Sequence, residues 1–236
     1  MKGFPILLFI SFNALGFNSV HAQTVIEALP RWIASIHVNY MMPDEPVNQF
    51  LQDNKLGIQF ELQYRVQYNK PFLLGVYYNE WTLSKYVLKY LQSSGVGDID
   101  IRERANTRRL EWGVTAGFYP EINWLLQPYL QGRFGAAIFQ TSSILTDDDT
   151  DESIERISEA TSLAPAYGLD IGVHIVPNIW YLRGDVRFGY VGNISTSFML
   201  LNEDEVDTTG FPIDYFETVE SAGKWWKISV GVSYMF

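Results

Sequence analysis

Two histidines, His37 and His174, are the side chains in this sequence that are best suited to act as a general base. Transfer or hydrolysis of an acyl group needs such a base beside a hydroxyl nucleophile and an acidic group that orients the base. If the chain forms strands, three serines can lie near His37, namely Ser35, Ser229 and Ser233. Asp170 shares a strand face with His174, but four residues of extended chain separate them by roughly 13 Å, which excludes a direct contact. We therefore expect both histidines to be structural.

A second chemically capable group consists of charged side chains at alternate positions of otherwise apolar segments. Its members are Glu61, Arg65, Arg109, Glu111, Arg133, Asp170, Arg183, Asp185, Arg187 and Lys227. Alternation places all of them on the face opposite the apolar side chains. Because a charge removed from water must be paired, we expect one hydrogen-bonded ion network. A gated path for ions is the alternative.

Alternation of apolar and polar side chains runs from residue 31 to the end of the chain. It is clearest in KLGIQFELQYRVQY (55–68), and it recurs in 31–40, 72–81, 108–119, 124–139, 163–176, 179–190 and the C-terminal KWWKISVGVSYMF. A period of two indicates β-strands. About eight such segments, each near the ~9–11 residues that a tilted membrane strand needs, predict an all-β fold. We expect an eight-stranded antiparallel up-and-down transmembrane β-barrel.

The connections between these segments alternate in length. They are short at 69–71, 120–122 and 177–178, and long near 41–54, 83–106, 141–161 and 192–223. This alternation is typical of a barrel with tight periplasmic turns and long outer loops. A two-residue turn at 177–178 further predicts that Asp170 lies opposite Asp185. A soluble β-sandwich or lipocalin-like barrel is the alternative fold, and the Gln, Arg and Glu on the polar faces disfavour it.

The first residues, MKGFPILLFISFNALGFNSVHA, are typical of a secretory signal peptide (1–22), with Val20 and Ala22 at the cleavage positions. The rest, 23–236, is expected to form one outer-membrane β-barrel domain. The chain has no cysteine, so no disulfide framework is expected.

These features together resemble the small outer-membrane barrels of Gram-negative bacteria, of the OmpA and OmpX type. Gly231, Tyr234 and Phe236 stand where that family places its C-terminal assembly signal. The resemblance implies recognition by the barrel-assembly machinery and, after export through the inner membrane and periplasm, localisation in the cell outer membrane. Some small barrels of this kind remodel the acyl chains of lipid A, but no motif of such an enzyme is present.

We expect a non-enzymatic outer-membrane barrel whose acidic outer loops interact with a surface, a protein partner or lipopolysaccharide. A lipid A-modifying enzyme and a narrow solute or ion channel are the alternatives. No cofactor is expected, and the net charge of −10 disfavours a nucleic-acid partner. The segment 83–106 combines aromatic, leucine and basic side chains, and it is the best candidate for a partner-facing surface.

An acidic segment near residue 150 is the remaining candidate for a ligand site. Asp147, Asp149 and Asp151 have the spacing of a calcium loop, but Glu152 and Ser158 occupy its glycine and final glutamate positions. We therefore expect a solvated acidic segment there, with no metal site. Divalent-cation bridging to lipopolysaccharide phosphates is the alternative.

Overall fold

The structure is a computed structural model, and it describes residues 31–43, 56–67, 70–94, 97–120, 125–150, 152–175, 181–201, 216–221 and 223–236. The predicted signal peptide 1–22, the turn at 177–178, most of the predicted loop 41–54 and residues 202–215 of the predicted loop 192–223 lie outside these residues. In the described part of the chain, no helix is long and apolar enough to cross a membrane.

Ten strands make up the described structure. They are β1 (Trp32–Pro43), β2 (Leu56–Arg65), β3 (Phe72–Ser94), β4 (Gly97–Phe118), β5 (Leu126–Asp147), β6 (Ser153–Ile175), β7 (Leu182–Asn193), β8 (Thr196–Leu201), β9 (Phe216–Ser221) and β10 (Lys224–Met235).

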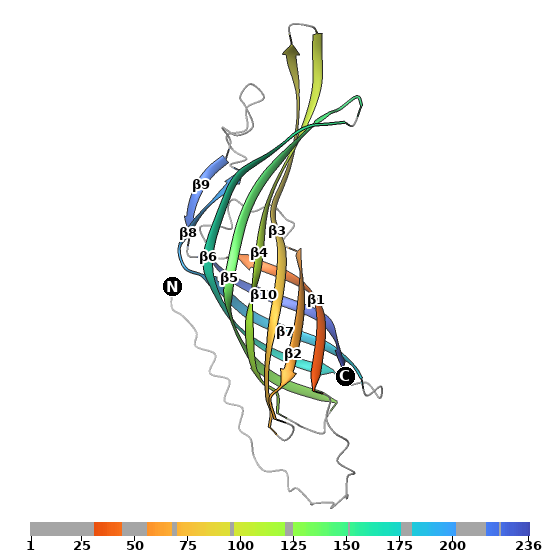
Figure 1. Cartoon of the computed structure of the whole chain (residues 1–236), viewed down its shortest axis with the longest axis vertical. Coiled ribbons are helices and arrows are strands. Elements are labelled where there is room, and N and C mark those ends of the chain that lie inside the picture. Colours follow the sequence, from red (N-terminus) through yellow and green to blue (C-terminus); the bar gives the residue numbers. More distant parts are fainter. Residues whose placement is uncertain are drawn as a thin grey trace, which may run out of the picture.

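Eight of the strands close into a barrel in the order β1-β10-β7-β6-β5-β4-β3-β2, and every neighbouring pair is antiparallel (Figure 1). Two backbone hydrogen bonds between Trp32 and Phe236, of 2.9 and 3.0 Å, join the first strand to the last residue. The predicted eight-stranded antiparallel barrel is therefore confirmed. β8 and β9 form a separate hairpin between β7 and β10 in the sequence, which was not predicted.

The wall of the barrel is apolar outside and polar inside. Along β2, Ile58 and Phe60 are about half exposed, whereas Gln59 and Glu61 are buried. A soluble barrel would place these two kinds of side chain the other way round. The closed barrel leaves no strand edge unpaired, and its exposed face is apolar. The medium around this wall is therefore lipid.

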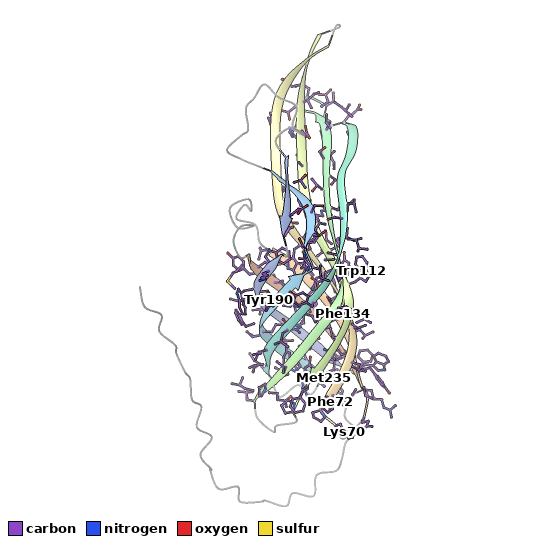
Figure 2. All side chains as sticks on the ribbon, turned by 90° about the vertical axis from the view of Figure 1, so that its left-hand side faces the viewer. Lys70, Phe72, Trp112, Phe134, Tyr190 and Met235 are labelled. Atoms are coloured by element: carbon purple, nitrogen blue, oxygen red, sulfur yellow. The ribbon has the colours of Figure 1, made fainter. Side chains whose placement is uncertain are left out.

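Aromatic side chains lie at both ends of this wall, as expected for a protein that meets two membrane interfaces. Phe72 and Phe118 pair at the end where β1 begins and β10 finishes, and their ring centroids are 5.5 Å apart. Trp226 and Tyr190, 5.2 Å apart, lie toward the other end. Figure 2 shows Phe72 at the lower end of the barrel and Tyr190 above it. We call these the terminal end and the projecting end.

Four strands continue far beyond the projecting end. β3 and β6 have 23 residues each and β4 and β5 have 22, whereas β2 has 10 and β1, β7 and β10 have 12 each. β2 pairs with β3 only as far as Trp81, and β7 pairs with β6 only as far as Ala166. Beyond these points β3 to β6 form an open four-stranded sheet, visible at the top of Figure 1. We call residues 82–94, 97–108, 140–147 and 153–161 the projecting sheet.

The projecting sheet differs from the expected outer loops near 83–106 and 141–161, because both segments are strand over most of their length. The inward side chains of this sheet are buried, and among them are the apolar Leu83, Ile101 and Ala105 and the polar Glu103 and Thr107. They continue the inward and outward alternation of the barrel strands, and β8 lies against β6 and β5 in the same region. Burial of one face stabilises paired strands, which are only marginally stable when both faces meet water.

The predicted register between β6 and β7 is wrong. Asp185 lies opposite His174, and Asp170 lies opposite Gly189, four residues away from the expected pairing. The cause is a longer connection, because β6 ends at Ile175 and β7 begins at Leu182. An even offset leaves every side chain on its predicted face, so the inward and outward assignments hold.

Candidate functional site

Arg187 on β7 lies at the centre of the ions in the barrel lumen. Its Nη1 is 3.0 Å from Oε2 of Glu61 on β2, and its Nη2 is 2.6 Å from Oδ2 of Asp185 on its own strand. A third carboxylate, that of Asp170 on β6, lies 3.9 Å from Nη1. All four residues are buried, with at most 5% of their surface exposed. A guanidinium suits this place, since it donates in several directions at once.

Asp170 also binds two further cations. Nε of Arg133 on β5 is 3.0 Å from its Oδ2, and Nζ of Lys227 on β10 is 3.3 Å away. Lys227 donates in addition to Oε1 of Gln59 at 2.9 Å. Strands that are not neighbours in the barrel are thus cross-linked through one carboxylate.

The two histidines meet at Asp185. Nε2 of His37 lies 2.8 Å from Oδ2 of Asp185 and 2.7 Å from Nη2 of Arg187, and Nε2 of His174 lies 3.5 Å from the same carboxylate oxygen. The hydroxyl of Tyr129 donates to Oδ1 at 2.7 Å. Sequence reasoning missed this cluster, because the predicted register placed Asp185 opposite Asp170. The inward position of Tyr129, between two glutamines of the same face, was the available signal.

Arg109 occupies an aromatic box nearer the projecting end. Its Cζ lies 4.5 Å from the ring centre of Trp225, 4.8 Å from Trp81 and 5.7 Å from Phe139. Nη1 pairs with Oε2 of Glu111 at 2.6 Å. The cation is therefore held by three aromatic faces and one carboxylate in a site without solvent exposure.

Apolar layers close the lumen on both sides of this network. Toward the projecting end lie Met41, Trp81, Leu83, Ala137, Phe139, Ala166 and Trp225. Toward the terminal end lie Ile33, Leu73, Tyr119, Tyr129 and Met235. An eight-stranded barrel has just enough interior to be filled by side chains, and here it is filled. Neither histidine is more than 3% exposed, so neither reaches a substrate in this arrangement.

The other two predicted lumen charges, Arg65 and Arg183, make hydrogen bonds to uncharged partners. Arg65 donates to the backbone oxygen of Lys70 at 3.3 Å, and Arg183 donates to Oε1 of Gln127 at 2.7 Å. The structure thus brings at least eight of the ten predicted lumen charges into buried ion pairs, and Arg65 and Arg183 make hydrogen bonds as well.

The three candidate serine nucleophiles are all buried in the lumen. The hydroxyls of Ser35 and Ser233 are 2.9 Å apart and bond to each other. Ser229 is fully buried. Nε2 of His37 faces Asp185 and Arg187, and among the described residues it has no serine hydroxyl as a partner. The arrangement gives the acyl-transfer hypothesis no nucleophile activated by a base.

The proposed assembly signal lies on β10 and the last residue. Tyr234 and Phe236 face outward, about half exposed, with ring centroids 5.9 Å apart. Gly231 faces inward and pairs with His37 on β1. A Cβ at Gly231 would collide with the backbone oxygen of Ile36 and the ring of His37. The glycine therefore makes room for the histidine, whereas recognition of these residues during assembly stays a prediction.

Replacing Gly231 by Ala is expected to lower the free energy of unfolding by about 1–3 kcal/mol, because the added methyl group overpacks the site against His37. Urea unfolding of the refolded protein in detergent micelles measures this. Gly184→Ala is the matched control, since the nearest atom to a Cβ there is 3.5 Å away, which is ordinary contact. Equal stability of the two variants would contradict the packing role of Gly231.

A closed antiparallel barrel with an apolar exterior and a buried charge network belongs to the outer-membrane class of proteins, which cross the bilayer with strands. The predicted resemblance to small outer-membrane barrels is confirmed at the level of architecture.

No protein-family model and no curated protein sequence matches the chain. Three solved structures are similar to it in fold. A major outer membrane protein from Thermus thermophilus has 12% identity and a TM-score of 0.49, over 87% of this chain and 99% of that chain. Neisserial surface protein A has 9% identity and a TM-score of 0.43, over 87% and 97%. Ail, the attachment invasion locus protein of Yersinia pestis, has 15% identity and a TM-score of 0.41, over 88% and 99%.

Proposed function

We propose that this outer-membrane barrel is not an enzyme and that it binds a partner outside the membrane through its projecting sheet. The observation that carries the proposal is strand length. A tilted strand needs about 9–11 residues to cross the membrane, whereas β3 to β6 have 22 or 23. The additional length serves no purpose in crossing, and it holds an ordered surface beyond the lipid.

The filled lumen supports a barrel that does not conduct. Arg109 is enclosed by Trp81, Phe139 and Trp225 on the projecting side, and Tyr119 stacks on Tyr129 with ring centroids 4.6 Å apart on the terminal side. A path for ions would have to open both layers. We expect planar bilayers containing the full chain to show no conductance steps.

The buried histidines favour a non-enzymatic role. Asp185 accepts hydrogen bonds from the side chains around it in the lumen, and His37 and His174 have no route to a lipid substrate in the described structure. Acyl transfer or hydrolysis on lipid A would require a base within hydrogen-bond reach of the hydroxyl or water that attacks the acyl ester.

The acidic segment near Asp147 supports a structural turn. Oδ1 of Asp147 accepts the backbone N–H of Asp149 at 2.9 Å and that of Thr150 at 3.3 Å. Asp148 pairs with Lys89 at 2.7 Å and with Arg102. Among the described residues, no group of three or more ligating side chains could hold a metal ion. These contacts shift our proposal from acidic loops toward the projecting sheet as a whole.

Complementation of a strain that lacks the protein tests the proposal. In a shortened chain, Asn-Gly replaces residues 83–107 and 141–160, so that the paired residues Thr82 and Arg108, and Gln140 and Thr161, flank two-residue hairpins. We expect the full chain to restore surface attachment, and the shortened chain to fail although it folds and inserts.

His37→Gln and His174→Gln are the matched variants for the enzymatic alternative. Both are expected to restore function, and the mass spectrum of lipid A is expected to be the same with and without the protein. Restoration by the shortened chain would overturn the proposal. A changed acyl pattern that the histidine variants abolish would favour the enzyme instead.

A further inference from the structure

The outward face of β4 changes character abruptly at the projecting end of the barrel. Val114 and Trp112 are exposed apolar side chains of the lipid-facing wall. The next outward positions beyond Leu110 are Arg108, Asn106, Arg104 and Arg102, along the same strand. The side chain of Arg108 is half exposed, and Arg104 is exposed as well. A charged surface therefore continues the lipid-facing wall without interruption.

β3 adds two lysines to this surface. A register shift between Thr82 and Ser84 turns the odd-numbered residues that follow on β3 outward, and Lys85 and Lys89 are exposed. Lys89 lies directly opposite Arg102, and Val87 lies opposite Arg104. We call Lys85, Lys89, Arg102, Arg104 and Arg108 the basic face. Like charges in opposite positions of a sheet destabilise the pairing unless anions lie close to them.

Carboxylates of the chain neutralise part of the basic face. Glu80 lies 3.4 Å from Arg108, and Asp148 pairs with Lys89 and Arg102. In the part of the chain that the structure describes, neither Lys85 nor Arg104 has a carboxylate within ion-pair distance. Two exposed cations on neighbouring strands thus lack a carboxylate partner among the described residues, and both can accept an anion from solvent or lipid.

The basic face begins at the height of the headgroup layer of a membrane and extends above it. A strand rises about 3.3 Å per residue, so Arg108 lies roughly 7 Å and Arg104 roughly 20 Å along the strand from Leu110. Tilt of the strand reduces the height of both above the membrane. The polar layer adds about 5–8 Å to the hydrocarbon core on each side. Arg108 therefore lies inside this layer, whereas Arg104, roughly 15 Å above Leu110 after tilt, lies above it.

We propose that the basic face binds the phosphate groups of lipopolysaccharide in the surrounding leaflet. Guanidinium and ammonium groups are the side chains that recognise phosphate, and the face is continuous with the wall that holds the acyl chains of the same lipid. The inference rests on the proposed function, because it names the partner of one side of the projecting sheet. A lipid partner is favoured over a soluble one by this continuity.

Titration of the purified full chain in a non-ionic detergent with lipid A, with dephosphorylated lipid A and with inorganic phosphate tests the proposal. The variant is K85Q/R104Q, and the matched control is R31Q/K70Q, which removes the same charge at the terminal end. Each cation beside an anionic lipid surface contributes about a five-fold gain in affinity. We expect K85Q/R104Q to bind lipid A roughly 30-fold more weakly than the full chain does, and the control to bind as the full chain does.

Dephosphorylated lipid A is expected to bind at least about ten-fold more weakly than lipid A to the full chain. Equal binding of lipid A by K85Q/R104Q and the control, or equal binding of the two lipids by the full chain, would overturn the proposal. Competition by inorganic phosphate at equal concentration would also overturn it, in favour of a site for free phosphate. If K85Q/R104Q binds normally while the shortened chain fails in complementation, this inference fails and the proposed function stands.

Discussion

Replacing Arg187 by Ala is expected to destabilise the barrel by about 3–5 kcal/mol, the range for removing one partner from a buried ion pair. The substitution leaves the carboxylates of Glu61 and Asp185 in the lumen without the guanidinium that lies 3.0 and 2.6 Å from them. Urea unfolding in detergent micelles, with the heat-dependent shift in gel mobility as a second readout, measures the loss.

Arg183→Ala on the same strand is the matched control. Arg183 is only partly buried, and it donates to Gln127 at 2.7 Å. We expect its loss to lower stability by about 1–2 kcal/mol, which is typical of hydrogen bonds from a charged side chain that is not fully buried. A loss at Arg187 no larger than that at Arg183 would show that the central network contributes little to the barrel.

Placing arginine on the lipid-facing wall is expected to have the second large effect. Val114 is 57% exposed and lies between Ala116 and Trp112 on the outward face of β4. Val114→Arg puts a charge near the middle of the apolar band, which costs about 2–4 kcal/mol in a membrane barrel. Folding into vesicles, followed by urea titration, measures this cost.

Val87→Arg makes the same chemical change above the membrane. Val87 is 47% exposed on β3, in the projecting sheet, and its neighbours there are polar. We expect its stability to fall by no more than about 1 kcal/mol, through repulsion by the exposed Arg104 that lies opposite. Equal effects at Val114 and Val87 would mean that the outward face of β4 does not meet lipid.

The wall of the barrel was predictable from the sequence because its chemistry repeats with the pleat. Each segment from Leu56 to Tyr64, or from Trp226 to Tyr234, alternates between a lipid-facing and an inward side chain, and no other regular structure has this period. The same rule predicted which charged residues face inward. Their pairing was not predictable, because it depends on how far each connection shifts one strand against the next.

The cluster around Asp185 illustrates this limit. A two-residue turn would have placed Asp185 beside Asp170, but the connection over residues 176–181 brings it to His174 instead. The sequence pattern could not reveal the change, because a shift by an even number of residues leaves every side chain on the same face of its strand. The hydrogen bond of Tyr129 was not predictable for a related reason. Its hydroxyl donates to the carboxylate of Asp185, which lies on another strand.

The projecting sheet left a clear signal in the sequence. The stretch DIDIRERA (98–105) alternates with the same period as the barrel strands, with Glu103 as a charged residue at an inward position. The expectation of a loop there rests on the rule that a membrane strand needs only about 9–11 residues, which limits the crossing but does not limit the strand. The hairpin of β8 and β9 depends on contacts with β6 and β5 and had no local pattern of comparable strength.

Labelling of single cysteines on intact cells tests most directly the claim that the barrel is sealed and presents its projecting sheet to the outside. The chain contains no cysteine, so each variant carries a single reactive thiol. A membrane-impermeant maleimide is expected to label Val87→Cys at once, Lys70→Cys only after the cells are broken, and Ser229→Cys only after unfolding. Labelling of Lys70→Cys but not Val87→Cys on intact cells would reverse the orientation, and rapid labelling of Ser229→Cys in the folded barrel would contradict a sealed lumen.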